Sequence, residues 1–202
     1  MKLYRYVIVY DVGSAPNYDP PCATLAICKP AIRRTASPGD VVLAFTGSTL
    51  GTAPHAVRWA GVVAESMTFA AYWADHRFEA KKPHATPTPD NIYKPDMHGV
   101  LVQERNPVHD QRNIARDVGG RNVLAFDQWW HFPHQSPELP DEFEEFRVHN
   151  PRQGHRVSEI DGPKWAALSR WLDANVVGNA MENSRTGGCG PSAARRVTRS
   201  RC

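Results

Sequence analysis

A polar stretch between two apolar strand segments constrains this chain more than any other feature. Leu3–Tyr10 and Val41–Phe45 are dense in β-branched and aromatic residues, a composition typical of strands. Between them, residues 11–40 carry several glycine and proline turns, two cysteines and three cations. Polar groups packed this densely between apolar strands are more typical of a binding loop than of a mere connection. The sequence therefore predicts a ligand-binding segment over residues 11–40.

The rest of the chain alternates short strand patterns with short helical ones. Ala23–Cys28 fits either a buried strand or a helical turn, because periodicity does not separate the two in so short a run. Residues 81–96 carry four prolines and read as a long loop, which is usually functional or disordered. We expect further strands at Val57–Glu65, Gly99–Gln103, Asn122–Phe126 and Trp129–Phe132, and helices at Ile32–Thr35, Thr68–Asp75, Asp141–Phe146 and Gly162–Val176.

These elements predict an α+β fold, a mixed and partly closed β-sheet or barrel with flanking helices. We expect one domain over residues 1–178, followed by a disordered basic tail over residues 179–202. No GxGxxG, GxxxxGK[ST] or GxSxG motif occurs, so we predict no dinucleotide or other cofactor.

The positive net charge belongs to the C-terminal tail. Five of the 24 Lys and Arg residues follow Glu182, the last acid, which leaves 19 cations against 21 acids in residues 1–182. A basic tail can hold nucleic acid non-specifically, or it can simply be solvated. Because the preceding part of the chain is nearly neutral, the cations of residues 29–34 form a local positive feature.

The sequence also predicts the cellular compartment of the protein. No apolar run approaches the ~20 residues that span a bilayer, and the N-terminus has no signal-peptide layout. Four scattered cysteines are too few for a disulfide framework. We therefore expect a cytoplasmic protein without a membrane partner.

Several runs of residues resemble a known family. Asp11–Asn17, Cys22–Arg34 and Gly39–Asp40 are similar to the opening of the nucleotide modification associated domain 2 family. Its later pieces are matched by Met67–Trp73, Asp75–Phe78, Asp90–Tyr93 and Pro137–Pro140. The resemblance covers roughly the first 155 residues. It implies a companion of DNA base-modification systems, with nucleic acid, most simply DNA, or a nucleotide as ligand, and with other proteins of such a system as partners.

A second resemblance is architectural. A cationic helical turn, then Gly39–Asp40 and a hydrophobic strand, is similar to the PUA-like group of PUA, ASCH, EVE and YTH domains. That resemblance implies a small, partly closed barrel that holds RNA or a modified, flipped-out base. Likeness of fold alone does not establish function.

Binding a flipped base requires stacking rings, hydrogen bonds to the base edge and cations for the flanking phosphates. Trp129 and Trp130 are adjacent and face opposite sides of a strand, so at most one lies in a pocket. Trp59, a further ring, is more typical of core packing. We predict edge contacts from Asp11, Asn17 and Thr24, phosphate contacts from Lys29, Arg33 and Arg34, and stacking by Tyr93, Trp129 and Trp130.

Covalent and metal chemistry are alternatives to binding. Cys28 as a nucleophile needs a nearby base or cation; otherwise it is a small buried residue. His131, His134, His149 and His155 lack the spacing of zinc sites, so we predict no metal. No catalytic pair is evident. The sequence thus favours a module that recognises a modified base, with an enzyme acting on a nucleobase or nucleotide, or a partner-binding scaffold, as alternatives.

Overall fold

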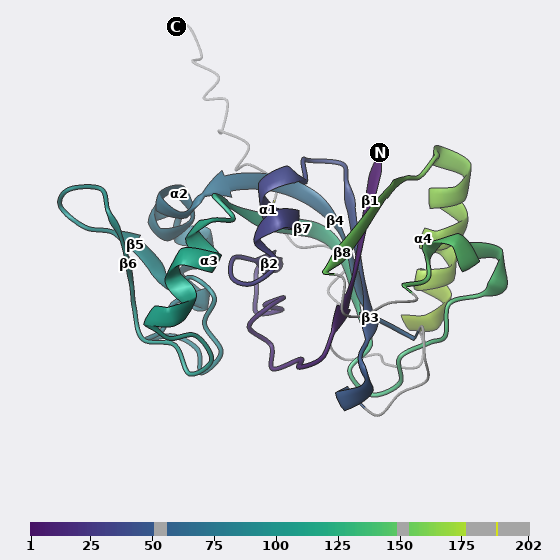
Figure 1. The fold of residues 1–202 in the computed structure, drawn as a ribbon, viewed down its shortest axis with the longest axis horizontal. Helices are drawn as coiled ribbons and strands as arrows, with labels where there is room; N and C mark the ends of the chain where they lie inside the picture. Colours follow the sequence, from purple (N-terminus) through teal and green to yellow (C-terminus); the bar gives the residue numbers. More distant parts are fainter. Residues whose placement is uncertain (51–55, 149–153, 177–188, 190–202) are drawn as a thin grey trace, which may run out of the picture.

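A mixed six-stranded sheet organises the molecule (Figure 1). The computed structural model describes residues 1–50, 56–148, 154–176 and 189. The sheet contains, in spatial order, β2 (Ala23–Leu25), β7 (Asn122–His131), β4 (Val57–Thr68), β3 (Val41–Thr46), β1 (Lys2–Ile8) and β8 (His155–Glu159). β5 (Tyr93–Pro95) and β6 (Leu101–Gln103) form a separate antiparallel pair that projects from the body.

The strands of this sheet pair in both the parallel and the antiparallel direction. β1 pairs in parallel with β3, from Leu3 opposite Val41 to Ile8 opposite Thr46. The other neighbours in the sheet are antiparallel. The α+β fold is therefore confirmed, but β2 and β8 end the order of the described strands and the sheet does not close into a barrel. The likeness to PUA-like domains stays a prediction.

The two faces of the sheet pack against different helices. α4 (Gly162–Val176) buries Leu168 and Leu172 against one face, together with the 3₁₀ helix η4 (Asp141–Phe146). The opposite face packs against α1 (Pro30–Thr35) through Ile32. Because side chains alternate along a strand, Trp130 joins the first core and Trp129 the second, as expected from their adjacency.

A third apolar cluster supports the projecting pair of strands. It joins α2 (Phe69–Ala74) to Tyr93 and to the residues that flank β2. The remaining helices are α3 (Ile114–Val118) and the 3₁₀ helices η1 (Ser48–Leu50), η2 (His76–Lys81) and η3 (Gln111–Asn113).

The sequence located several elements and missed others. Thr68 accepts a hydrogen bond from the N–H of Ala71, and Asp161 accepts one from Lys164, so both expected N-caps are confirmed. The two strands expected over residues 122–132 are one strand, β7, whose pairing with β4 shifts register twice. β8 and α3 were not predicted.

A disulfide joins the segment before β2 to the last residue that the structure describes. Cys22, just before β2, is bonded to Cys189, which is fully buried. Arg77 donates a hydrogen bond of 2.7 Å to the carbonyl of Cys189. The rest of the expected tail over residues 179–202 lies outside the described residues, so its disorder stays a prediction.

Across the described ranges, no helix is long and apolar enough to cross a membrane. Disulfides are more frequent in oxidising compartments than in the cytosol. The expected cytoplasmic location stays a prediction.

Candidate active site

A cavity of about 340 Å³ opens beside the start of α1. Its wall is made by Cys28, Lys29 and residues 30–32 on one side, and by Arg116, Gly154 and His155 on the other. It thus lies between α1, α3 and the beginning of β8, which Figure 1 shows side by side. Its volume is at the lower end of the roughly 300–1,000 Å³ of small-molecule sites.

Cys28 occupies a sharp turn between β2 and α1. Cys28 and Lys29 both adopt left-handed backbone conformations, with φ of 57° and 42°, before Pro30 begins the helix. Such conformations are uncommon outside glycine and persist where surrounding bonds hold them. Here Asp117 Oδ1 accepts a 3.0 Å bond from the Cys28 N–H, and Arg33 Nε donates a 2.7 Å bond to the Cys28 carbonyl. A strand–turn–helix of this kind is how α/β-hydrolases expose a nucleophile.

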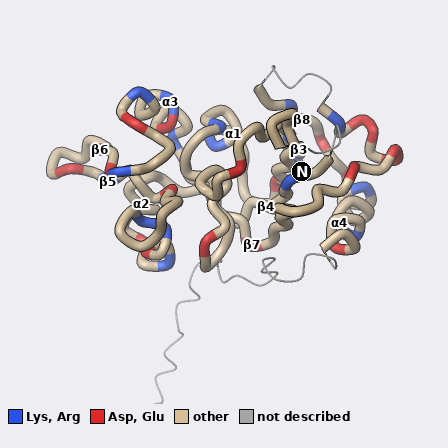
Figure 2. Tube along the Cα trace, turned by 90° about the horizontal axis from the view of Figure 1, so that it is seen from below, with Lys and Arg blue, Asp and Glu red and all other residues tan. Residues whose placement is uncertain are grey.

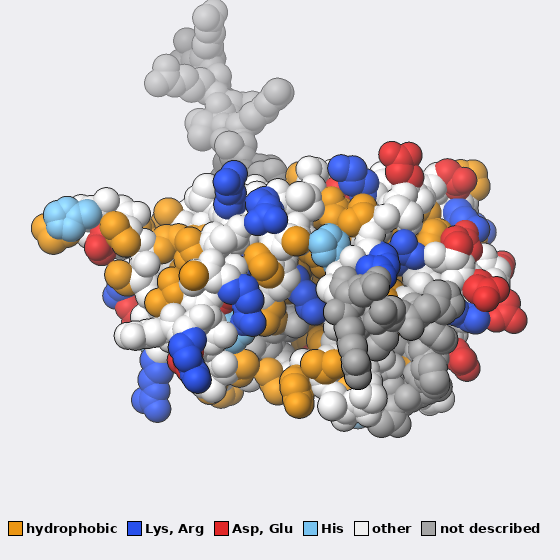
Figure 3. Space-filling view, viewed as in Figure 1, with side chains coloured by type: hydrophobic (Ala, Val, Ile, Leu, Met, Phe, Trp, Pro, Cys, Tyr) orange, Lys and Arg blue, Asp and Glu red, His pale blue; other side chains and the backbone are white. Residues whose placement is uncertain are grey.

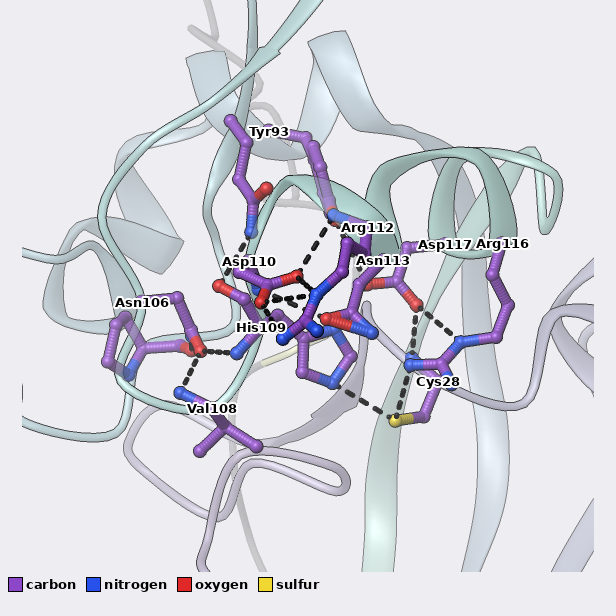
Figure 4. A network of polar contacts seen from close by, with 12 residues as sticks. Cys28, Tyr93, Asn106, Val108, His109, Asp110, Arg112, Asn113, Arg116 and Asp117 are labelled. Atoms are coloured by element: carbon purple, nitrogen blue, oxygen red, sulfur yellow. Dashed lines mark hydrogen bonds and ion pairs between the residues drawn. The ribbon is translucent and has the colours of Figure 1, made fainter.

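The thiol of Cys28 faces a histidine and a carboxylate that come from a distant part of the chain (Figure 4). Cys28 Sγ lies 3.2 Å from His109 Nε2. The other ring nitrogen of His109, Nδ1, contacts Asp117 Oδ2 in a short hydrogen bond. Cys28, His109 and Asp117 therefore form a chain of contacts with the order of a nucleophile, a base and a residue that orients the base.

Asp117 is held in place from several directions. Its side chain is fully buried, and Oδ2 also accepts a 2.9 Å hydrogen bond from the hydroxyl of Tyr93. Asn106 fixes the loop that carries His109, because Asn106 Oδ1 accepts 2.7 Å bonds from the N–H groups of Val108 and His109. The arrangement is thus preorganised by its supporting bonds.

The electrostatics favour a charged histidine. Burial opposes the charge on His109, but its hydrogen bonds to Asp117 and Cys28 raise its pKa to about 9. Burial likewise opposes the charge on Asp117, and the contacts with His109 and the Cys28 N–H lower its pKa overall. At neutral pH an imidazolium therefore lies between the carboxylate and the sulfur.

The same three residues could also offer ligands to a metal, since one donor atom of each lies within 4.8 Å of the others. However, Asp117 is engaged by Tyr93, by His109 and by the Cys28 N–H. That leaves Cys28 Sγ and His109 Nε2, two ligands where zinc sites usually have at least three from the protein. The geometry fits nucleophilic catalysis better than metal binding.

Comparison with known proteins gives a family. The family model described as "nucleotide modification associated domain 2" matches residues 1–185 of the 202. The chain belongs to this family. The match is longer than the first 155 residues expected from motifs, and the family name associates the protein with nucleotide modification. No curated protein and no solved structure matches the chain.

Of the binding residues predicted from the sequence, Lys29 alone is part of the described cavity lining. Arg33 instead is fully buried and donates to three backbone carbonyls, those of Cys28, Asn122 and Asp117, at 2.7, 2.8 and 2.5 Å. Arg34 is exposed and donates to the Gly119 carbonyl at 3.1 Å.

Tyr93 supports the site from within. Its ring is buried and its hydroxyl is bonded to Asp117. The base stacking predicted for this ring stays a prediction. The structure places Tyr93 behind the carboxylate that orients His109.

Asn17 and Thr24 belong to a buried network beneath the turn. Their backbones form a bridge, and Thr24 Oγ1 donates a 2.7 Å hydrogen bond to Asp90. Lys81 Nζ donates to Asn17 Oδ1 at 2.5 Å. Burial lowers the pKa of Lys81 to about 8, although the nearby carboxylate of Asp90 opposes the shift.

The other residues predicted to bind are not part of the cavity lining. Asp11 is ion-paired with Arg58, and its Oδ2 lies 3.0 Å from His131 Nε2. Trp129 and Trp130 are 3% and 1% exposed in opposite cores. The nucleic-acid contacts predicted for these residues stay predictions, but the structure does not bring them together at one concave surface.

Sequence reasoning missed His109 and Asp117. They lie 81 and 89 positions after Cys28, in a segment without a clear periodic pattern. A lone cysteine with a histidine and an acid elsewhere in a chain is a known but weak signal. The need of Cys28 for a nearby base was recognised, and the structure provides that base.

Proposed function

We propose that the protein is a cysteine-dependent enzyme that cleaves or transfers an acyl group on a nucleobase or nucleotide. The observation that carries the proposal is the 3.2 Å contact between Cys28 Sγ and His109 Nε2, with Asp117 bonded to the far side of the ring. The family name supplies the nucleotide context.

In the first step, the Cys28 sulfur, as the thiolate that the second step regenerates, attacks the carbonyl carbon of an amide or ester. A carbon–sulfur bond forms, and the bond from the carbonyl carbon to the leaving nitrogen or oxygen breaks. The proton on His109 Nε2 passes to the leaving group. The product of this step is a thioester on Cys28 and a neutral His109.

In the second step, water or an amine attacks the thioester. His109 Nε2 accepts a proton from the attacking group, and the sulfur leaves as the thiolate. Asp117 remains charged and orients the ring through Nδ1. With water the overall reaction is hydrolysis, and with an amine it is acyl transfer.

Recognition of a modified base without chemistry is a second candidate function, and it is favoured by the cations at the cavity. Lys29 and Arg116 both line the cavity. In this alternative the ligand is DNA, another nucleic acid or a nucleotide, and Cys28 is only part of the wall. A role beside other proteins of a modification system is compatible with either function.

A panel of nucleosides and nucleotides with amide- or ester-linked substituents on the base tests the first function. Turnover by the wild type, its loss in Cys28→Ser and His109→Gln, and its retention in His98→Gln are expected. His98 is the matched control because it lies in the β5–β6 turn, away from the cavity. Tight binding of the panel with no turnover and no covalent adduct would favour the recognition function.

A further inference from the structure

The walls of the cavity beside Cys28 carry positive charge. Lys29 and Arg116 line it together with His155, and no Asp or Glu is part of the described lining. Figure 2 places Lys and Arg positions on α1 and α3, and Figure 3 shows basic side chains gathered over this part of the face. Most of the acidic side chains in that view lie at the end of the molecule where α4 lies.

Arg116 is the cavity cation in contact with the reacting sulfur. Its Nη2 is 4.0 Å from Cys28 Sγ, and its Nε is 3.6 Å from Asp117 Oδ1. Half of the side chain is exposed. Since a guanidinium has five donors in a planar fork, Arg116 can face Asp117 with one edge and present another to a ligand in the cavity.

Lys29 is the other cation of the cavity lining, and its position is fixed by two contacts. Its Nζ donates a 3.3 Å hydrogen bond to the Val7 carbonyl and lies 4.2 Å from the centre of the Tyr6 ring. Burial and the neighbouring Arg116 lower the pKa of Lys29, whereas Cys28 opposes that shift. Arg116 disfavours the charge on Lys29, so the two cations of the cavity lining repel, and an anion bound between them would relieve that repulsion.

The remaining wall is apolar or neutral. Pro30, Ala31 and Ile32 contribute apolar surface. Burial and the charges of Lys29 and Arg156 lower the pKa of His155, so this ring is neutral at pH 7 and can donate a hydrogen bond. A cavity with cations on its walls, a neutral donor and an apolar side suits a small group that bears an anion.

We infer that the substrate carries a phosphate that binds at Lys29 and Arg116, so that the acyl carbon meets Cys28 while the phosphate is held by the two cations. The substrate class is thus a nucleotide rather than a free base or an uncharged nucleoside. This inference rests on the proposed function, because it assumes that Cys28 is the reacting group. The phosphate can belong to a mononucleotide or to a nucleic-acid strand, and the experiment separates these sources.

The experiment compares alkylation of Cys28 by iodoacetate, an anion, and by iodoacetamide, its neutral analogue. Peptide mapping measures both rates at Cys28 in the full chain, and N-acetylcysteine gives the ratio for an unbiased thiol. We expect the iodoacetate-to-iodoacetamide ratio at Cys28 to exceed that reference about tenfold. Arg116→Gln and Lys29→Gln should each lower the ratio several-fold.

Arg112→Gln is the matched control, since Arg112 is an exposed arginine of the preceding turn, paired with Asp110 and absent from the cavity wall. It should leave the ratio unchanged. A nucleoside monophosphate should protect Cys28 from iodoacetamide at concentrations at which the nucleoside does not. Stronger protection by a short single-stranded oligonucleotide would identify the strand as the source of the phosphate, and weaker protection the free nucleotide.

The possible failures are distinguishable. If Cys28 reacts readily with iodoacetamide but shows no preference for the anion and no protection by phosphate, the anion site is wrong and the proposed nucleophile stands. If Cys28 reacts with neither reagent, both proposals are wrong. If Arg112→Gln lowers the ratio as much as Arg116→Gln, a general surface field is responsible and the assignment to these two residues fails.

Discussion

Cys28 Sγ and His109 Nε2 lie 3.2 Å apart although 81 positions separate the two residues. The turn after β2 presents the sulfur, and the loop before η3 presents the imidazole. Asp117 joins both segments, because it bonds the Cys28 N–H with one oxygen and the His109 ring with the other. The carboxylate therefore has a structural and a chemical role at once.

Asp117→Asn should weaken both the fold and the reactivity of the thiol. The substitution replaces one acceptor oxygen by a donor in a fully buried site that receives bonds from Tyr93, His109 and the Cys28 N–H. We expect a loss of about 2–4 kcal/mol in the free energy of unfolding, measured by urea titration. Asp110→Asn is the exposed control and should cost less than about 0.5 kcal/mol. Equal effects of the two changes would contradict the assigned role.

The contribution of His109 to stability should depend on pH in one direction. Because its folded pKa of about 9 lies above the unfolded value of about 6.5, its protonation stabilises the fold fully below pH 6.5. That contribution is lost as pH rises through 9. The difference in unfolding free energy between wild type and His109→Gln should therefore shrink between pH 7 and pH 10. A difference that stays constant or grows over this range would contradict the raised pKa of His109.

Arg33→Lys should destabilise the protein far more than Arg34→Lys. The planar guanidinium of Arg33 is buried and meets three carbonyls, which an ammonium on a flexible stem does not reproduce. Thermal and urea unfolding should show that Arg33→Lys lowers the free energy of unfolding by about 2–4 kcal/mol, and that Arg34→Lys lowers it by under about 0.5 kcal/mol. Similar values for both would mean that the carbonyl contacts of Arg33 do not stabilise the turn.

Reduction of the Cys22–Cys189 disulfide should lower stability without removing the thiol of Cys28. The bond closes a separation of 167 residues, and bonds across long loops typically contribute about 2–5 kcal/mol. Cys189→Ser should lower the melting temperature, and reductant should lower that of the wild type but not that of the variant. If reductant shifts both proteins equally, the bond is not the cause.

The fold could be predicted where burial imposes a pattern. Val41–Thr46 is buried at every position, and such a strand is visible as an apolar run. β8, by contrast, lies at the edge of the sheet and reads His-Arg-Val-Ser-Glu, so its sequence has no apolar run. α3 has only five residues, too few for a helical period to be evident.

For a related reason, only part of the site could be predicted from the sequence. Cys28 attracted notice because a cation and a proline follow it directly. Its base and orienting acid are brought to it by pairing and packing across the molecule, which no local pattern encodes. Arg33 differs from Cys28: its position in a cationic run predicts a phosphate contact, whereas the structure shows a buried side chain that donates to three backbone carbonyls.

The rate at which iodoacetamide modifies Cys28 at pH 7, in wild type and in His109→Gln, tests the central claim most directly. If His109 activates the thiol, the wild type should react about tenfold faster or more than the variant, and His98→Gln should match the wild type. Equal rates at Cys28 in wild type and His109→Gln would contradict the account.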